Sequence, residues 1–598
     1  MAKKFAEHNG LNLTEVNQQV LEEWGRKDVF HRSITERDGY PQFVFYEGPP
    51  SANGHPGIHH VLGRALKDTF NRYKTMKGYQ VLRKAGWDTH GLPVELGVEK
   101  DLGITKADID NHDSPRYIST EEYNQKCREN VMKFTQEWRD LTEKMGYFVD
   151  LDNPYITYDN KYIETLWWLL KQFYQKGLLY KGYTIQPYSP AAGTGLSSHE
   201  LNQPGCYRDV KDTTATAQFR IVDPRPEMNE WGTPVFLAWT TTPWTLPSNT
   251  ALCVGPNIDY VCVQTFNPYN GEKISAIMAG TRLDAYLKPE GEFAPMDCYK
   301  PGDKIIPYRI VCNYKGSDLL GMKYAQLMPW VKPCERLDDT SGAFVKDYAE
   351  SHEDKIFRVG KDAFVEMEET AFRVIPGDYV TTEDGTGIVH IAPTFGADDA
   401  KVAKDAGVPS LFLINKNGET RPMVDLQGKY YLMNELSDAF IAQCVNVDAY
   451  SRHAGDYVKN AYDPKYNVNG YDEKAAMKDE DLNIVLCMEM KQEGSAYKIG
   501  KHIHNYPHCW RTDKPVLYYP LDSWFIRSTA CKDRMVELNK TINWKPESTG
   551  VGRFGNWLEN LNDWNLSRSR FWGTPLPIWR NKDTREFAYS GVPNLFSI

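Results

Sequence analysis

The sequence predicts an α/β protein of several domains, on three observations. The chain has 598 residues, 41% hydrophobic and 25% charged, which is ordinary for a globular protein but too long for one domain. A strand, a Gly-rich turn, a helix and a second strand are expected in succession over residues 43–88. Residues 257–385 are rich in Gly, Pro, Val and Tyr and predict the short strands of an inserted β domain.

Composition excludes some classes of protein. No run of about 18 apolar residues is long enough to span a membrane, and the first residues lack the apolar core of a secretory signal. Eleven cysteines, none of them in a C-x-x-C pair, argue against a disulfide framework and favour a reducing cytoplasm. The net charge of −10 gives no support to a nucleic-acid partner but does not exclude one, because local basic grooves can coexist with it.

The first elements follow from hydrophobic spacing. Residues 1–42 predict a helical arm, in which Val16, Val20, Leu21 and Trp24 share one face. The compact apolar run 43–46 is bounded by Gly-Pro-Pro and predicts a buried parallel strand.

A turn and a helix come next. Nine of the twelve residues 48–59 are Gly, Pro, Ser, Ala or Asn, so that backbone there can approach a ligand closely. Leu62, Leu66, Phe70 and Tyr73 repeat at helical spacing, and Gly78 ends the helix. The helix N-terminus is expected at the carboxyl end of the sheet, where anions bind. A tight packing turn with a surface histidine explains the same residues without a ligand.

Two strings in this region carry a family resemblance. "FYEGPPSANGHPGIHH" and "GWDTHGLPVE" resemble the class I aminoacyl-tRNA synthetases of the isoleucine, valine and leucine group. The second string favours the isoleucine branch, the isoleucyl-tRNA synthetases, over a valyl- or leucyl-tRNA synthetase. The resemblance implies a Rossmann-like nucleotide-binding domain, here incomplete, with a large inserted β-rich editing domain.

The resemblance also implies roles for individual residues. Pro49 would line the amino-acid pocket, and Asp88 would accept charge-assisted hydrogen bonds from the substrate's ammonium group. Taken alone, Asp88 is equally well explained as a turn residue at the end of a strand. The residues expected around ATP are Asn53, Gly54, Gly57, His59 and His60.

The chain departs from the family signature His-x-Gly-His. Aligned on His60, it has Gly57 at the first position and His59 at the third, so the two residue types are exchanged. In the family, the first His contacts the phosphates and the Gly lets adenine lie flat on the backbone. We favour a working variant over a dead site, because the surrounding residues match the family. Inhibitors that mimic the adenylate are expected to bind it more weakly than they bind a His-x-Gly-His enzyme.

Two further strings resemble the editing domain of the same group. "AWTTTPWTLPSNTAL" and "GTGIVHIAPTFGADDA" lie about 150 residues apart; alone, each is equally typical of a strand or a capped turn. A hydrophobic pocket discriminates weakly against one missing methylene, by about 1–3 kcal/mol in the standard example, isoleucine against valine in this enzyme class. The resemblance implies a second, hydrolytic site. Asp399 would hold the ammonium group, the threonines would orient ester and water, and His390 would lie near the terminal ribose. Its residues are Thr240, Thr241, Thr242, His390 and Asp399.

The domain prediction combines these strings with the family's length. It places the helical arm at 1–42, the first half of the Rossmann-like domain at 43–202, the editing domain at 203–415, a connective insert at 416–501 and the return to the catalytic domain at 502–598. The family's Trp-Phe-Asp-Ser-Gly, Glu-Gly-Ser-Asp-Gln and Lys-Met-Ser-Lys-Ser segments do not occur in the sequence. We therefore expect the amino-terminal part of a longer enzyme, unable to form isoleucyl-adenylate alone.

The expected activity is that of an isoleucine–tRNA ligase with aminoacyl-tRNA deacylase activity, monomeric and not bound to a membrane. ATP with Mg²⁺, isoleucine and tRNA(Ile) would be its substrates. The cluster His502, His504, His508 and Cys509 allows a metal site, but a connector strand is the better explanation and no structural zinc is expected. A free-standing aminoacyl-tRNA deacylase and a non-catalytic RNA-binding remnant are the alternatives from other classes.

Overall fold

The computed structural model describes residues 10–338, 341–467, 471–581 and 587–589. The chain forms two compact units, which we describe separately. Unit 1 comprises residues 1–181 and 524–598, and unit 2 comprises residues 182–523. Strands β4 (Leu179–Ser189) and β20 (Leu517–Ile526) cross the two boundaries along the chain.

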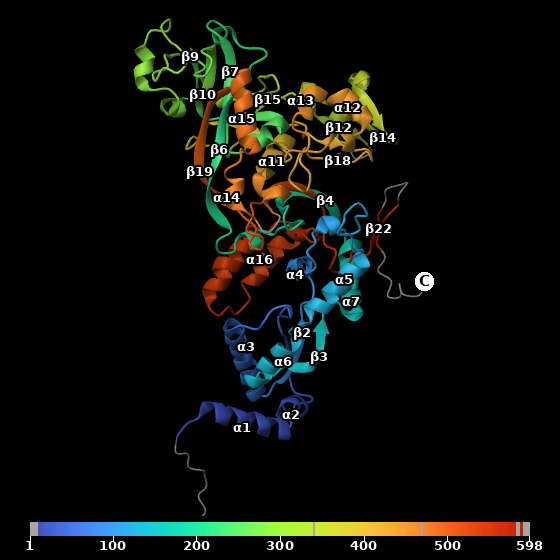
Figure 1. Cartoon of the computed structure of the whole chain (residues 1–598). Coiled ribbons are helices and arrows are strands. Elements are labelled where there is room, and N and C mark those ends of the chain that lie inside the picture. Colours follow the sequence, from blue (N-terminus) through green and yellow to red (C-terminus); the bar gives the residue numbers. More distant parts are fainter. Residues whose placement is uncertain (1–9, 339–340, 468–470, 582–586, 590–598) are drawn as a thin grey trace, which may run out of the picture. The chain divides into compact units, whose positions relative to one another are not determined.

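Unit 1 consists of the two ends of the chain and is mainly helical (Figure 1). Its helices are α1 (Leu13–Arg26), α2 (Val29–Thr35), α3 (Ile58–Met76), α4 (Leu92–Leu102), α5 (Thr120–Val131), α6 (Thr135–Lys144), α7 (Asn160–Gln175), α16 (Lys532–Asn539) and α17 (Gly555–Glu559). Its strands are β1 (Gln42–Tyr46), β2 (Gln80–Trp87), β3 (Asp150–Ile156), β21 (Trp564–Asn565), β22 (Ile578–Arg580) and β23 (Phe587–Tyr589).

The expected strand–turn–helix–strand unit is present. β1 pairs in parallel with β2, and β2 pairs in parallel with β3, in the order β1-β2-β3. α3 connects β1 to β2 and ends before Gly78, whose φ of 88° is readily adopted only by glycine. The α/β character expected from this segment is confirmed.

The expected burial of β1 is wrong. Val44 is 52% exposed and Tyr46 is 63% exposed. The strand lies at the edge of its sheet, and its alternate side chains point away from the packed side. Apolar composition predicts a strand here but does not distinguish an edge strand from a central one.

Helix α3 turns its polar face inward. Its buried residues are Arg64, Asp68, Asn71 and Thr75. The apolar stripe that predicted the helix lies on the outside, more than half exposed at each position: Leu62, Leu66, Phe70 and Tyr73. An exposed apolar stripe of this kind marks an interaction surface.

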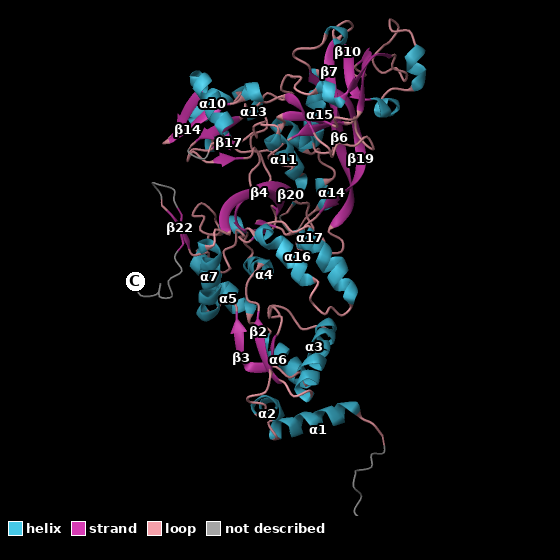
Figure 2. Ribbon diagram, turned by 180° about the vertical axis from the view of Figure 1, so that it is seen from behind, coloured by secondary structure: helices cyan, strands magenta, loops and turns pink. Residues whose placement is uncertain are grey.

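Unit 2 is built mainly of strands (Figure 2). Its strands are β5 (Thr194–Gly195), β6 (Tyr207–Arg220), β7 (Thr233–Thr240), β8 (Ala251–Val254), β9 (Asp259–Phe266), β10 (Lys273–Ala279), β11 (Arg309–Lys315), β12 (Cys334–Leu337), β13 (Ile356–Val359), β14 (Asp362–Glu366), β15 (Arg373–Pro376), β16 (Ile388–Ile391), β17 (Leu413–Ile414), β18 (Thr420–Arg421) and β19 (Ala496–Pro507). Its helices are α8 (Ser198–Leu201), α9 (Gly316–Leu319), α10 (Ala343–Ser351), α11 (Ala397–Asp405), α12 (Asp438–Cys444), α13 (Val447–Ser451), α14 (Glu473–Ala476) and α15 (Leu482–Glu493).

A nine-stranded sheet organises unit 2. Its main path is β11-β9-β10-β7-β16-β8-β15, and β6 joins β7 to the long strand β19. Segments 496–507 and 207–220, far apart in sequence, therefore run side by side (Figure 1). The β-rich insertion expected from residues 257–385 is confirmed. One of its buried clusters contains the fully buried side chains of Phe219, Phe236, Leu252 and Leu486.

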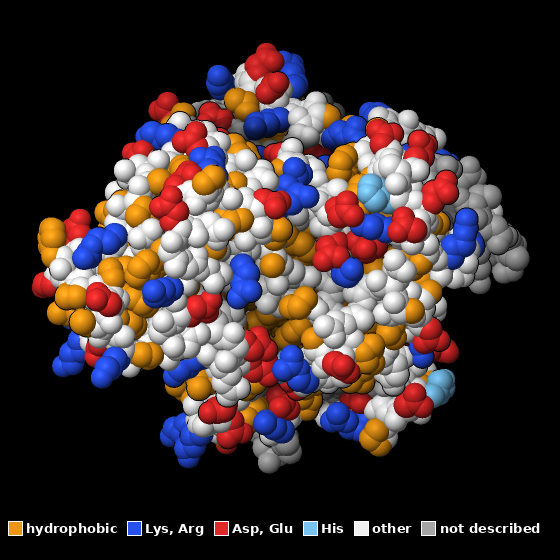
Figure 3. Space-filling view, turned by 90° about the horizontal axis from the view of Figure 1, so that it is seen from above, with side chains coloured by type: hydrophobic (Ala, Val, Ile, Leu, Met, Phe, Trp, Pro, Cys, Tyr) orange, Lys and Arg blue, Asp and Glu red, His pale blue; other side chains and the backbone are white. Residues whose placement is uncertain are grey.

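The surface adds two negative observations. Among the described helices, none is both long and apolar enough to cross a bilayer. Seen from above, acidic and basic side chains are interspersed over the described residues of that face, without one extended area of a single charge (Figure 3). The units divide the chain at 181/182 and 523/524; the five-part division at 42/43, 202/203, 415/416 and 501/502 stays a prediction.

Candidate nucleotide and hydrolytic sites

The Gly-rich turn forms one side of a cavity of about 390 Å³ in unit 1. Of the predicted residues, Gly54, His59 and His60 line it. Pro49, Asn53, Gly57 and Asp88 are not among its described lining residues, although each lies close in sequence to one or pairs nearby, as Asp88 bridges to Ser51. The first turn of α3 thus presents its N-terminus and both histidines to one hollow.

His60 is fixed by the turn itself. The Gly57 N–H donates to His60 Nδ1 at 2.8 Å, a capping contact at the start of α3. Desolvation lowers the pKa of His60, and the nearby His59 and Arg64 lower it further. The imidazole is therefore neutral at pH 7, with its Nε2 proton available.

His59 occupies the space above Gly57. Its ring lies 3.8 Å from that of His60 between centroids. A Cβ placed at position 57 would come within 2.7 Å of the His59 ring. The exchange of residue types is therefore one coupled change, because a side chain at 57 and the His59 ring compete for one volume.

The lining residues that sequence reasoning missed include four with large side chains: Glu47, Arg64, Lys67 and Trp138. The buried Glu47 carboxylate pairs with Lys67 and accepts a hydrogen bond from Tyr147. Helical spacing from His60 would have indicated Arg64 and Lys67, which follow it by four and seven positions.

Trp138, on α6, contacts both the Gly-rich turn and the first turn of α3. Its Nε1 donates to the Gly54 carbonyl at 2.9 Å, and its ring lies 4.6 Å from that of His60. The guanidinium of Arg64 stacks on the same ring at 4.9 Å. No sequence pattern links α6 to the turn, so this residue could be found only in the folded chain.

Asp88 directly follows β2. Its backbone N–H donates to the Pro50 carbonyl at 3.0 Å, and desolvation raises the pKa of its carboxyl. The returning segment brings Trp572 beside it: the indole donates to the Thr89 carbonyl at 2.6 Å and lies 5.2 Å from the His90 ring.

A second cavity, of about 340 Å³, lies entirely within unit 2. All five residues predicted for a hydrolytic site line it: Thr240, Thr241, Thr242, His390 and Asp399. They come from the end of β7, from β16 and from the first turn of α11. Gly385 also lines it, and with φ at 65° and Trp239 close by, a side chain there would clash.

Asp399 supplies a carboxylate to this cavity. Its Oδ2 accepts a hydrogen bond from the Ala392 N–H at 2.9 Å. Burial raises the pKa of Asp399 to about 6. The group is ionised at pH 7 and forms no ion pair with a cationic side chain among the described residues, which suits a bound ammonium group.

His390 is held in one orientation. Its Nε2 lies 2.9 Å from Thr245 Oγ1, and its Nδ1 lies 3.4 Å from the Asn249 amide, which is itself fixed by the Tyr324 hydroxyl at 2.6 Å. Burial lowers the pKa of His390 to about 4. The amide donates, so we assign the proton to Nε2. Thr245 and Asn249 were missed by sequence reasoning, although both lie within the same Thr-rich string.

The histidines considered for a metal lie in connecting chain. His502 and His504 are on β19, and His504 Nε2 pairs with Asp212 at 3.1 Å. Within the described residues there is no group of three or more His, Cys, Asp and Glu side chains arranged to hold a metal ion.

Comparison with known proteins adds a family. The profile of class I tRNA synthetases (I, L, M and V) matches residues 19–594. The isoleucine–tRNA ligase of Bacteroides thetaiotaomicron is 65% identical over all of this chain and 49% of its own length. That of Porphyromonas gingivalis is 59% identical over all of this chain and 48% of its own length. That of Clostridium novyi is 41% identical over 95% of this chain and 43% of its own length.

The chain thus spans about half the length of the curated relatives it matches. A crystal structure of a leucyl enzyme, titled as the LeuRS-tRNA-LeuAMS complex of Agrobacterium radiobacter K84 agnB2, covers 96% of this chain and 51% of its own. With 14% identity and a TM-score of 0.29, it adds nothing to the argument. The profile match alone covers nearly the whole sequence, and the chain belongs to the class I tRNA synthetases of the I, L, M and V group.

Proposed function

We propose that this chain is the amino-terminal part of an isoleucyl-tRNA synthetase with a hydrolytic editing site. The observation that carries the proposal is the second cavity. Five residues chosen from two strings about 150 residues apart line one hollow of unit 2. The high identity to isoleucine–tRNA ligases supports isoleucine over valine or leucine as the activated amino acid.

The nucleotide cavity would bind ATP. The N-terminus of α3 and the cationic side chains Arg64 and Lys67 offer positive charge to phosphates. His60 would donate from Nε2, and His59 would take the place of the imidazole that position 57 lacks. Asp88 would hold the ammonium group of isoleucine, and Pro49 would line its pocket. Magnesium would arrive with ATP as part of the substrate, and we assign no ligand for it.

The unit 2 cavity would hydrolyse Val-tRNA(Ile). Asp399 would anchor the ammonium group, which requires its ionised form. Thr240, Thr241 and Thr242 would orient the ester and a water molecule. His390 has both ring nitrogens engaged and a low pKa. It would therefore position the terminal ribose rather than act as the base.

Two activities separate in this chain. The editing cavity is assembled within unit 2 alone, whereas the nucleotide turn lies on a helix with an exposed apolar stripe. We therefore propose that residues 1–598 deacylate Val-tRNA(Ile) but do not form isoleucyl-adenylate alone. A deacylase acting by itself is the second candidate, and the self-contained cavity favours it.

The proposal is tested by substituting two neighbouring aspartates one at a time. Asp399→Ala should reduce hydrolysis of Val-tRNA(Ile) at least a hundredfold, because losing a buried charge-assisted contact costs about 3 kcal/mol or more. The matched control is Asp398→Ala, since Asp398 is exposed and does not line the cavity. Equal hydrolysis by both variants and the unaltered chain would remove the site.

A further inference from the structure

Residues 240–245, which we call the threonine turn, contribute threonines to the lining of the proposed editing cavity and are held by residues outside it. After β7, a short 3-10 helix (Pro243–Ser248) carries Trp244 between Thr242 and Thr245. Both backbone groups of Trp244 bond to buried side chains from residues 416–501. The Tyr430 hydroxyl donates to its carbonyl at 2.6 Å, and its N–H donates to Asn483 Oδ1 at 3.1 Å.

These bonds belong to a closed ring. The Asn483 amide donates to the Val458 carbonyl at 3.3 Å, and the Val458 N–H donates to the Gly428 carbonyl at 2.9 Å. Lys429 and Tyr457 form an antiparallel bridge that holds the segments of Tyr430 and Val458 together. Trp244 therefore closes a circuit whose other members are separated from it by about 190 to 240 residues of chain.

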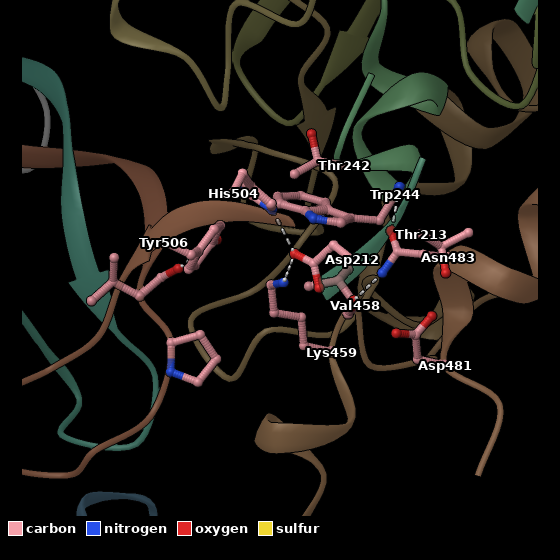
Figure 4. A network of polar contacts seen from close by, with 12 residues as sticks. Asp212, Thr213, Thr242, Trp244, Val458, Lys459, Asp481, Asn483, His504 and Tyr506 are labelled. Carbon is pink, nitrogen blue, oxygen red and sulfur yellow. Dashed lines mark hydrogen bonds and ion pairs between the residues drawn. The ribbon is translucent and has the colours of Figure 1, made fainter. Parts of the chain in front are cut away.

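The ring is anchored to the large sheet. The next residue after Val458, Lys459, pairs through Nζ with Asp212 Oδ2 at 3.4 Å, and His504 Nε2 approaches the same oxygen at 3.1 Å (Figure 4). Asp212 lies on β6 and His504 on β19. In Figure 4, dashed lines join Val458 to Asn483 and Asn483 to Trp244. The circuit thus connects the sheet to the threonine turn.

A displacement of Trp244 would reach the reacting groups directly. The Thr245 N–H donates to the Thr242 carbonyl at 3.0 Å, and Thr245 Oγ1 lies 2.9 Å from His390 Nε2. Tyr430 is 1% exposed and Asn483 is 6% exposed, so neither is itself available to a substrate. Buried side chains that satisfy both backbone groups of one residue fix its position with little freedom.

We propose that Tyr430 and Asn483 are positioning residues, which hold the threonine turn in the geometry that hydrolysis of the aminoacyl ester requires. The proposal rests on the hydrolytic function proposed above. It assigns part of the editing chemistry to the connective segment 416–501, which contributes no lining residue to the cavity among the described residues.

Tyr430→Phe tests the hydroxyl alone, and Tyr450→Phe is its matched control. Both tyrosines are 1% exposed and pack edge-on against Trp330. The Tyr450 hydroxyl also donates to a backbone carbonyl, that of Tyr431, at 2.8 Å. Its bond does not reach the threonine turn. In the 598-residue chain, Tyr430→Phe should slow single-turnover hydrolysis of Val-tRNA(Ile) about tenfold with unchanged half-saturation. Tyr450→Phe should leave the rate within about twofold while lowering the Tm equally. Equal rates for the two variants would overturn the proposal.

Asn483→Leu gives a readout that does not depend on activity. Hydrogen exchange of the backbone amides of Trp244, Thr245, Leu246 and Ser248, the non-proline residues of this short helix, should accelerate at least tenfold, while exchange in β12 stays unchanged. Unchanged protection of these amides would contradict the clamp, by which we mean the hold of Tyr430 and Asn483 on the threonine turn. If the unaltered chain fails to hydrolyse Val-tRNA(Ile), the proposed function fails, and the exchange result still decides whether the clamp exists.

Discussion

The nucleotide turn and the editing cavity are built on opposite principles. In unit 2, the elements around the cavity pack against buried hydrophobic clusters, and both backbone groups of Trp244 in the turn are hydrogen-bonded. In unit 1, helix α3, which begins where the Gly-rich turn ends, buries its polar face and exposes its apolar one. The residues proposed for the hydrolytic site all come from one unit. Those proposed for the nucleotide site lie at the start of a helix whose apolar stripe is exposed.

The largest expected effect comes from comparing a buried side chain of unit 2 with an exposed side chain of α3. Leu486→Ala on α15 removes a fully buried side chain and should cost about 2–5 kcal/mol of unfolding free energy. Leu66→Ala on α3 removes a side chain that is 58% exposed, and should cost about 0.5 kcal/mol or less. Urea unfolding of each purified variant measures both. A large loss from Leu66→Ala would show that the stripe on α3 is already packed.

The charge of Asp399 gives an intermediate effect on stability. Its folded pKa of about 6 lies above the model-compound value of 3.8, so folding favours the protonated form. The penalty is absent below the unfolded pKa, grows as pH rises and is complete above about pH 6. Asp399→Asn should therefore raise the Tm at pH 7.5 by a few degrees and leave it unchanged at pH 4. A lower Tm at pH 7.5 would contradict a strained carboxylate.

The same group predicts a pH profile. Hydrolysis of Val-tRNA(Ile) should fall about tenfold per pH unit below pH 6, as Asp399 gains its proton. His390, with a pKa of about 4, stays neutral through this range and should add no second inflection. Rates from pH 5 to 8 at fixed ionic strength provide the check, and a flat profile would remove Asp399 from the binding step.

The smallest expected effect concerns the exchanged signature. Gly57→His alone places a side chain against the His59 ring and should weaken binding of a non-hydrolysable isoleucyl-adenylate mimic. Gly57→His with His59→Gly frees that volume and should tighten binding about tenfold over the unaltered chain, or about 1.4 kcal/mol. Calorimetric titration compares the three. Identical affinities would mean that these positions do not contact the ligand.

The succession of helices and strands could be predicted from the sequence, but which face of each element is buried could not. Spacing located α3 and its two flanking strands, because each periodicity belongs to a few adjacent residues. Periodicity cannot say whether Leu66 faces a core or a surface, since that depends on what covers the helix. Similarly, the Thr-rich string indicated Thr242, but Trp138, Tyr430 and Asn483 reach their sites from distant elements that no local pattern connects.

Under the proposed function, unit 2 carries the hydrolytic site, and the nucleotide site lies at the start of α3, whose apolar stripe is exposed. The most direct test of this proposal is a pair of assays on the purified 598-residue chain: deacylation of Val-tRNA(Ile), and isoleucine-dependent exchange of pyrophosphate into ATP. We expect measurable deacylation that Asp399→Ala abolishes, with no exchange above background. Robust exchange without deacylation would contradict the proposal.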